Sequence, residues 1–230
     1  MLSALSREQI LELWERGAQR HPLDRALLLM GSARPGDTLH DLADVSVGQR
    51  DQTLIALRCT MFGRELSGYV DCPACKTRLE FVLDAESLRS DASDAVIDVD
   101  GLRIRCPTSR DLASVMSEPN PEYRLAQRCC ATTDGEPPLL SPAQVLMIES
   151  ALAEADAAAD IVLDFSCEQC DIKWQTAFDI GDYLWREIEA QAARLLADIH
   201  TLARAYGWSE REVLALSDTR RAAYIDRVLA

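Results

Sequence analysis

The 230-residue sequence contains no long hydrophobic run, although 48% of its residues are hydrophobic. A membrane-spanning helix needs about 18 or more consecutive apolar residues, so no span and no membrane partner are expected. The first residues also lack the basic start and apolar centre of a secretion signal. Eight cysteines in a chain without such a leader indicate a reducing compartment. We therefore expect a cytoplasmic protein.

Positive charge is scarce. The chain has 24 Lys and Arg against 38 Asp and Glu, which gives a formal net charge of −14. Proteins that bind nucleic-acid phosphates rely on clustered Lys and Arg. This composition therefore argues against DNA or RNA as the main partner, and it suits a protein that binds other proteins.

Motifs of catalytic sites are absent as well. The three histidines, His21, His40 and His200, are scattered and belong to no HExxH or HxxxH motif. The sequence also has no GxSxG elbow, no Walker-type glycine loop and no GxGxxG motif. We therefore predict that the protein is not an enzyme.

Two CxxC pairs are the sharpest chemical feature of the chain, and each lies between two segments that are typical of strands. Two intervening residues let both sulfurs of a pair point at one centre from a single turn, and four thiolates form the closed tetrahedral set typical of structural Zn²⁺. The pairs lie much farther apart than in common zinc ribbons, but the cost of closing a loop grows only with the logarithm of its length. We predict one structural zinc site with the ligands Cys72, Cys75, Cys167 and Cys170.

Other interpretations of these cysteines stay open. A CxxC thiol oxidoreductase is less favoured, because its dithiol belongs at the start of a helix in a βαβ unit and neither pair has that setting. Four reduced thiols packed as small apolar residues are a further alternative. A c-type haem is excluded, because Lys76 and Asp171 stand where that motif requires His. The remaining cysteines show no ligand spacing, and we expect buried thiols without an assigned role at Cys59, Cys106, Cys129 and Cys130.

The pattern of caps, turns and apolar spacing predicts an α+β fold that is mostly helical. Residues 1–64 are expected to form an N-terminal helical lobe. Residues 65–180 are expected to form a β unit, in which the two zinc-knuckle hairpins make a discontinuous zinc-ribbon-like unit. This unit includes one further hairpin, at Asp100-Gly101, and a helical insert over about 107–158. Residues 181–230 are predicted as a C-terminal helical segment, whose apolar stripe packs within the chain or on a second copy.

Several motifs, taken in order, resemble a known family. They are His21-Pro-Leu-Asp-Arg-Ala-Leu-Leu-Leu29, Gly48-Gln-Arg-Asp51, Cys72-Pro-Ala-Cys75, Arg105-Cys-Pro-Thr-Ser-Arg-Asp-Leu112 and Tyr206-Gly-Trp-Ser209. This order is similar to that of phage baseplate proteins related to the baseplate hub assembly chaperones of T-even-like tails, which are encoded with contractile tails and extracellular contractile injection systems. The resemblance implies a non-enzymatic assembly chaperone, adaptor or minor structural component. It also implies baseplate and hub proteins as partners. It does not imply whether the cytoplasmic protein stays associated with the finished virion or injection particle. The zinc site is not implied by the family and depends on the cysteines of this chain alone.

A zinc-ribbon protein that binds nucleic acid or serves transcription is the main alternative function. It requires a basic face around the two CxxC turns. The cations available there are Lys76, Arg78 and Lys173, and the nearby carboxylates are Asp71, Glu80, Glu168 and Asp171. This balance favours a protein partner over a nucleic acid.

Overall fold

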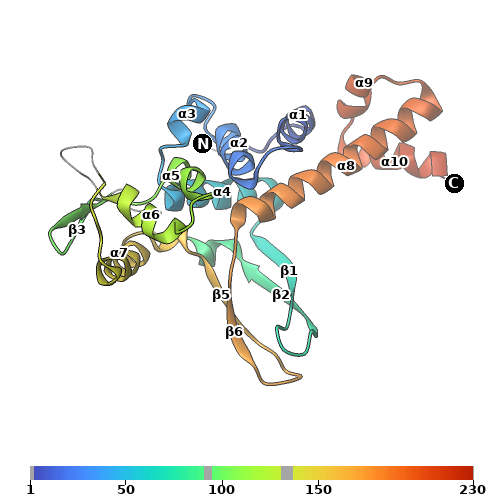
Figure 1. Cartoon of the computed structure of the whole chain (residues 1–230). Coiled ribbons are helices and arrows are strands. Elements are labelled where there is room, and N and C mark those ends of the chain that lie inside the picture. Colours follow the sequence, from blue (N-terminus) through green and yellow to red (C-terminus); the bar gives the residue numbers. More distant parts are fainter. Residues whose placement is uncertain (1–2, 91–94, 131–136, 230) are drawn as a thin grey trace.

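A computed structural model of the chain describes residues 3–90, 95–130 and 137–229 (Figure 1). The fold is α+β and mostly helical, with three two-stranded antiparallel sheets among the described residues. The predicted fold class is therefore confirmed. Within the described ranges, no helix is long and apolar enough to span a membrane.

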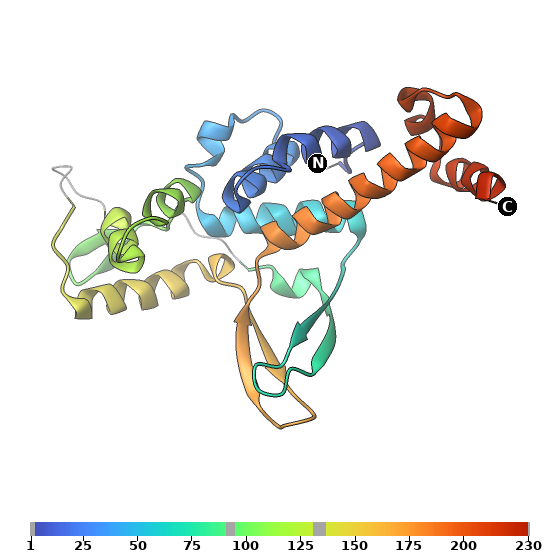
Figure 2. The ribbon, with the colours of Figure 1, turned by 45° about the vertical axis from the view of Figure 1, so that its right-hand side comes forward.

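The helical lobe consists of four N-terminal helices and the first part of a long one. Their bounds are α1 (Arg7–Gly17), α2 (Pro22–Ala33), α3 (Leu39–Leu42), α4 (Val47–Phe62) and α8 (Ile180–Tyr206). Figure 2 shows α8 running beside α1, α2 and α4. Here the indole of Trp185 occupies the space that a side chain on Gly17 would need, so a glycine permits the close approach of α1 and α8. The core of the lobe thus takes residues from both ends of the sequence.

Two β-hairpins extend from this lobe with their turns at the free end (Figure 1). The first joins β1 (Glu65–Asp71) to β2 (Arg78–Asp84) and is followed by the short helix η1 (Ala85–Leu88). The second joins β5 (Val162–Ser166) to β6 (Lys173–Ala177). In both hairpins, exposed residues alternate with partly buried ones, so each has an apolar face and a polar face.

The chain between the two hairpins forms an insert with a core of its own. It comprises β3 (Ile97–Val99), β4 (Leu102–Ile104), α5 (Ser109–Val115), α6 (Pro121–Cys129), α7 (Pro142–Ala155) and η2 (Ala157–Ala159). Asp100 and Gly101, at φ 52° and 77°, form the tight turn that their sequence predicts. The insert core centres on Ile104, Cys129 and Ile148, and is separate from the core of the helical lobe.

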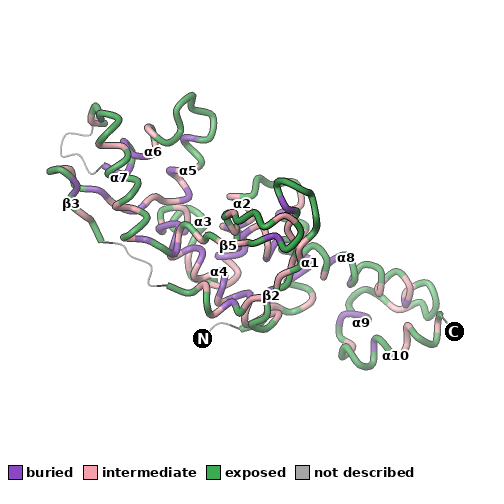
Figure 3. The backbone as a smooth tube through the Cα atoms, turned by 90° about the horizontal axis from the view of Figure 1, so that it is seen from below, coloured by how far each residue is buried: buried purple, intermediate pink, exposed green. Residues whose placement is uncertain are grey.

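The C-terminal helices α9 (Glu210–Leu214) and α10 (Asp218–Leu229) lie at the far end of α8, away from the hairpins (Figures 1 and 3). Gly207, at φ 69°, ends α8 in the left-handed conformation. The predicted apolar stripe of α8 packs within the chain as far as Leu202, whereas Tyr206 is 41% exposed. Most of this stripe is therefore an intramolecular seam.

Arg58 connects α4, β1 and α8, and its side chain is only 4% exposed. Its Nε and Nη2 donate to the two carboxylate oxygens of Glu187 at 2.9 and 2.6 Å. Its Nη1 donates to the carbonyls of Gly63 and Glu65 at 2.8 and 2.6 Å. Lysine cannot reproduce this planar set of donors, so we expect Arg58→Lys to lower the free energy of unfolding by about 1–2 kcal/mol.

Urea denaturation measures this loss. Arg64→Lys is the matched control, because the Arg64 side chain is 63% exposed and pairs with Asp84 at the surface. We expect the control to change the free energy of unfolding by less than about 0.5 kcal/mol. Equal losses in both variants would show that the buried contacts of Arg58 contribute no more to the free energy of unfolding than a surface ion pair does.

Candidate metal centre

Each CxxC pair occupies the turn of a hairpin, and the two turns have the same backbone geometry. In the first turn, the Cys72 N–H donates to the Thr77 carbonyl at 2.9 Å, and the Lys76 N–H donates to the Cys72 carbonyl at 3.0 Å. The second turn repeats both bonds at the corresponding positions around Cys167, each at 2.9 Å. The sequence similarity of the two turns thus extends to their conformation.

The residue after the second cysteine adopts a left-handed conformation in both turns. Lys76 has φ 60° and Asp171 has φ 56°. This conformation is costly for residues with a Cβ and costliest for β-branched ones. The turn therefore tolerates this strain to bring its two sulfurs to one side.

Substitution of Lys76 tests this requirement. Glycine favours the left-handed region, so Lys76→Gly should keep both stability and metal binding. Lys76→Val should lower the free energy of unfolding by about 1–2 kcal/mol, as measured by urea denaturation of the metal-loaded protein. Lys173→Val is the control, because Lys173 lies in strand β6, where valine is favourable. If Lys76→Val left the free energy of unfolding unchanged, the left-handed conformation would not be required at this position.

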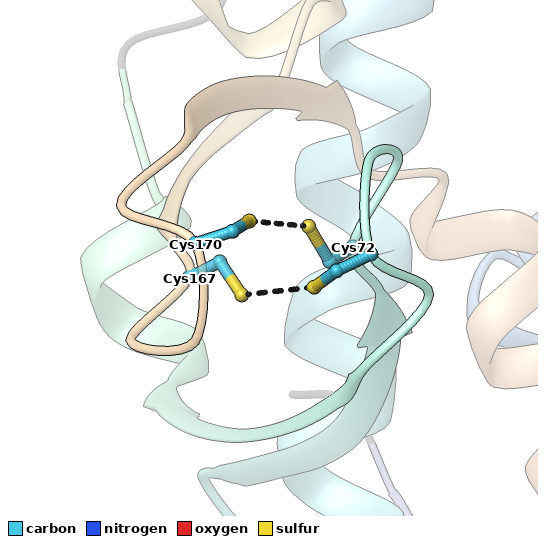
Figure 4. A group of neighbouring side chains, drawn as sticks. Cys72, Cys167 and Cys170 are labelled. Carbon is cyan, nitrogen blue, oxygen red and sulfur yellow. Dashed lines mark hydrogen bonds between the residues drawn. The ribbon is translucent and has the colours of Figure 1, made fainter.

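The turns bring the four cysteine sulfurs together (Figure 4). All four lie within 4.8 Å of one another. Cys72 Sγ is 3.6 Å from Cys170 Sγ, and Cys75 Sγ is 3.6 Å from Cys167 Sγ. Four sulfurs at about 2.3 Å from a tetrahedral zinc ion are about 3.8 Å apart, so this arrangement has the dimensions of a four-thiolate site. Both of these close pairs join one hairpin to the other.

Hydrogen-bond donors in the first turn favour the thiolate form that binds metals. Cys75 is an exposed residue, and its sulfur and the Thr77 hydroxyl oxygen form a hydrogen bond of 3.2 Å. The hydroxyl of Thr77, followed by its backbone N–H, lowers the pKa of Cys75 to about 6. The backbone N–H of Cys75 also lowers the pKa of the buried Cys72 thiol. Thiolates are the ligand form, so these donors assist metal binding near neutral pH.

At Cys170 the neighbouring sulfurs instead oppose ionisation. At Cys170 the backbone N–H of Ile172 lowers the pKa, but burial and hydrogen bonds with the other three thiols raise it to about 12. Four neighbouring thiolates repel one another unless a cation lies between them. The cluster therefore has the chemistry of a cation site rather than of a single reactive thiol.

Apart from these sulfurs, aromatic rings connect the two hairpins. Among the described residues, no backbone hydrogen-bond ladder runs from one hairpin to the other. Phe81 on β2 meets Phe165 on β5 edge-on, with ring centroids 5.5 Å apart, and Phe165 stacks on Trp174 at 5.6 Å. The Phe81 ring covers Gly68, its partner in the β1–β2 register. The sulfur cluster is therefore the main connection at the ends of the hairpins.

The other cysteines lie outside this cluster. Cys106, Cys129 and Cys130 are buried in or beside the insert, and Cys59 is half-buried on α4. Burial raises the pKa of Cys129 to about 12, so this thiol is inert near neutral pH. In the described part of the chain, the four cysteines of the CxxC pairs form the one cluster of potential ligands that could hold a metal ion.

Two contributors to the site were missed by the sequence reasoning. Thr77 follows Cys75 by two residues, and that position is the only signal for its hydrogen bond to the sulfur. The contact of Phe81 with Phe165 joins residues that lie far apart in sequence and has no local signal.

Comparisons with known protein families, with curated proteins and with solved structures find no match. The assignment of the site therefore depends on its geometry alone. The four cysteines form a candidate metal centre. Its two halves come from hairpins on either side of the insert, and the resemblance to baseplate proteins stays a prediction from the sequence.

Proposed function

We propose that this chain is a non-enzymatic assembly chaperone, adaptor or minor structural component of a contractile phage-tail-like baseplate, stabilised by a structural zinc ion. The observation that carries the proposal is the convergence of four sulfurs, all within 4.8 Å, from two distant hairpins. Four thiolates are the typical ligands of structural zinc and leave no coordination position for water or substrate. The resemblance of the sequence motifs supplies the assignment to a baseplate.

Zinc in this site supplies a cross-link between parts of the chain that share few other contacts. In small zinc peptides, metal binding contributes about 10–16 kcal/mol to folding. Cys72 and Cys75 hold the ion from one hairpin, and Cys167 and Cys170 hold it from the other. The two hairpins become one rigid unit, and the helical lobe and the insert can then present fixed surfaces to a protein partner.

The nucleic-acid alternative is weakened by the surroundings of the first turn. Arg78 is one of the few cations there, and its guanidinium lies over the Tyr69 ring at 4.0 Å and pairs with Asp71 at 3.1 Å. An arginine engaged in this way offers less charge to a phosphate. The local charge therefore supports a protein partner.

Co-expression with tube, sheath, spike and hub proteins of a contractile tail tests the function. We expect the tagged, zinc-loaded chain to retain at least one baseplate or hub protein through size-exclusion chromatography. A Cys72→Ser/Cys167→Ser variant should lose that partner together with the metal, because the platform is no longer rigid. Failure of the wild-type chain to retain any tail protein would reject the baseplate assignment.

A further inference from the structure

Helix α7 is apolar on two opposite faces. Its inner face packs on the insert core, where Ile148 is fully buried and Val145 and Leu152 are partly buried. Its opposite side, termed the outer α7 face, consists of residues spaced three and four apart on the exposed side of the helix. These residues are Ala143, Leu146, Met147, Ser150 and Ala153, and the exposed Glu149 and Glu154 border them on the same side of the helix.

The outer α7 face is unusual for a solvent-facing helix surface, which normally carries charged and polar residues. Leu146 is 67% exposed and Met147 is 48% exposed, side by side in the sequence. The other three members are small, so a partner can approach the helix closely on both sides of this apolar pair. An exposed apolar pair with small neighbours offers a surface on which a partner helix can pack.

The charged residues of α7 itself are all acidic. Between Arg128 and Lys173 the sequence has no Lys or Arg, but it has nine Asp and Glu residues. Glu149 and Glu154 lie exposed on α7 itself. At the N-terminal end of the helix, Gln144 donates to a carboxylate oxygen of Asp100 at 3.2 Å, which brings a further acidic group to α7. The apolar pair thus lies on a helix whose own charges are negative and whose N-terminal end contacts a further carboxylate.

This charge decides between two kinds of occupant. A second copy of the chain would bring two acidic helices together, and like charges at an interface oppose association. A helix with an apolar stripe flanked by Lys or Arg would instead satisfy both the apolar pair and the carboxylates. The 14 residues of α7 match a partner helix of about four turns.

We propose that the outer α7 face binds an amphipathic helix of a different protein, with an apolar stripe flanked by basic residues. This inference rests on the proposed adaptor function and identifies the surface by which the insert recognises its partner. Leu146 and Met147 are the apolar anchors, and the carboxylates of Glu149 and Glu154 select the basic flanks.

A phage-displayed library tests the inference with the full-length, zinc-loaded protein as bait. The library contains helical peptides of about 16 residues, long enough to match α7, with randomised stripe and flank positions. We expect the selected peptides to have apolar residues at i, i+3, i+4 and i+7 and Lys or Arg beside them. Fluorescence anisotropy of a selected peptide should show weaker binding as salt rises.

The double variant Leu146→Glu/Met147→Glu should weaken peptide binding about tenfold or more, because both anchors are lost. Val82→Glu is the matched control, since Val82 is also 67% exposed but lies on β2. The control should bind within about twofold of wild type. Circular dichroism checks that both variants keep their helices.

Three results would overturn the inference. They are a selection that yields no peptide, selected peptides without basic flanks, and equal binding by the double variant and wild type. Sedimentation velocity measures the oligomeric state. A dimer of the wild-type chain that becomes a monomer in the double variant would show that a second copy covers the face, and would also overturn the inference. If the double variant still retains a baseplate protein, the inference fails and the adaptor function stands. If the wild-type chain retains no baseplate protein, the adaptor function fails. The peptide selection then still shows whether the outer α7 face binds a basic amphipathic helix.

Discussion

The substitution Cys72→Ser is expected to abolish stoichiometric metal binding and to unfold the turns of both hairpins. A site with three sulfurs binds zinc far more weakly, and metal binding is worth on the order of 10 kcal/mol in small zinc peptides. The aromatic contact between Phe81 and Phe165 cannot replace that amount. The helical lobe has its own buried core, including Leu54 and Leu184, so its helices should persist.

Elemental analysis and hydrogen exchange by mass spectrometry measure these effects separately. Wild type should contain one zinc ion per chain. Cys72→Ser should lose the ion and lose amide protection over residues 65–84 and 162–177, while α4 and α8 stay protected. A chelator applied to wild type should give the same pattern.

Cys59→Ser is the matched control for this substitution. Cys59 is a half-buried thiol on α4, outside the sulfur cluster. The control should keep both the metal and the protection of the hairpins. A Cys72→Ser protein that still holds one zinc ion per chain, or whose hairpin turns stay protected, would contradict the proposed centre.

Removal of the Asp111 carboxylate should cause the largest loss of stability within the insert. The side chain is 2% exposed. It accepts two hydrogen bonds from Arg105, at 2.6 and 3.0 Å, and one from Arg128 at 3.0 Å. It also accepts the Thr108 N–H at 3.0 Å and so closes the capping box of α5. Asp111→Ala removes the acceptor for both arginines and its half of the capping box of α5, and we expect a loss of about 2–4 kcal/mol in the free energy of unfolding.

Urea denaturation of Asp111→Ala gives this value. Asp44→Ala is the matched control, because the Asp44 side chain is 53% exposed and pairs with Arg110 at the surface. We expect the control to lose less than about 1 kcal/mol. Similar losses at both positions would show that burial adds nothing to the Asp111 network.

The pH dependence of stability should reveal the same carboxylate. Burial alone raises the pKa of Asp111, but hydrogen bonds from Arg105 and Thr108 bring it down to about 2, below its ordinary value of 3.8. A lowered pKa means that the contribution is present above 3.8 and is lost as the pH falls towards 2. The difference in free energy of unfolding between wild type and Asp111→Asn should therefore shrink, by about 2 kcal/mol, as the pH falls through this window.

Local signals in the sequence were sufficient for much of the fold. Capping boxes at Ser6, Ser141 and Ser209 begin helices, as the pattern predicts, because the capping hydrogen bonds join residues three apart. Gly63 and Gly207 end helices at positive φ, which glycine adopts without strain. The CxxC spacing likewise predicts that each turn directs two sulfurs to one side.

Contacts between distant residues were beyond the reach of such signals. The pairing of Cys72 with Cys170, and of Cys75 with Cys167, depends on how two hairpins are placed by the helical lobe. The bonds of Arg105 and Arg128 to Asp111 depend on how α5 and α6 pack. The two apolar faces of α7 become distinct only when one of them is seen to be buried.

The position of the sulfur cluster has a consequence for the topology of the chain. Cys75 and Cys167 are 92 positions apart in the sequence and meet in the sulfur cluster. An ion bound there therefore closes the chain between them, which includes the insert, into a ring. A single proteolytic nick within that ring would leave two fragments held together at two places, by the ion and by the shared core of the helical lobe. New termini could therefore be engineered in the insert while the ion and the lobe core keep the two halves of the protein together.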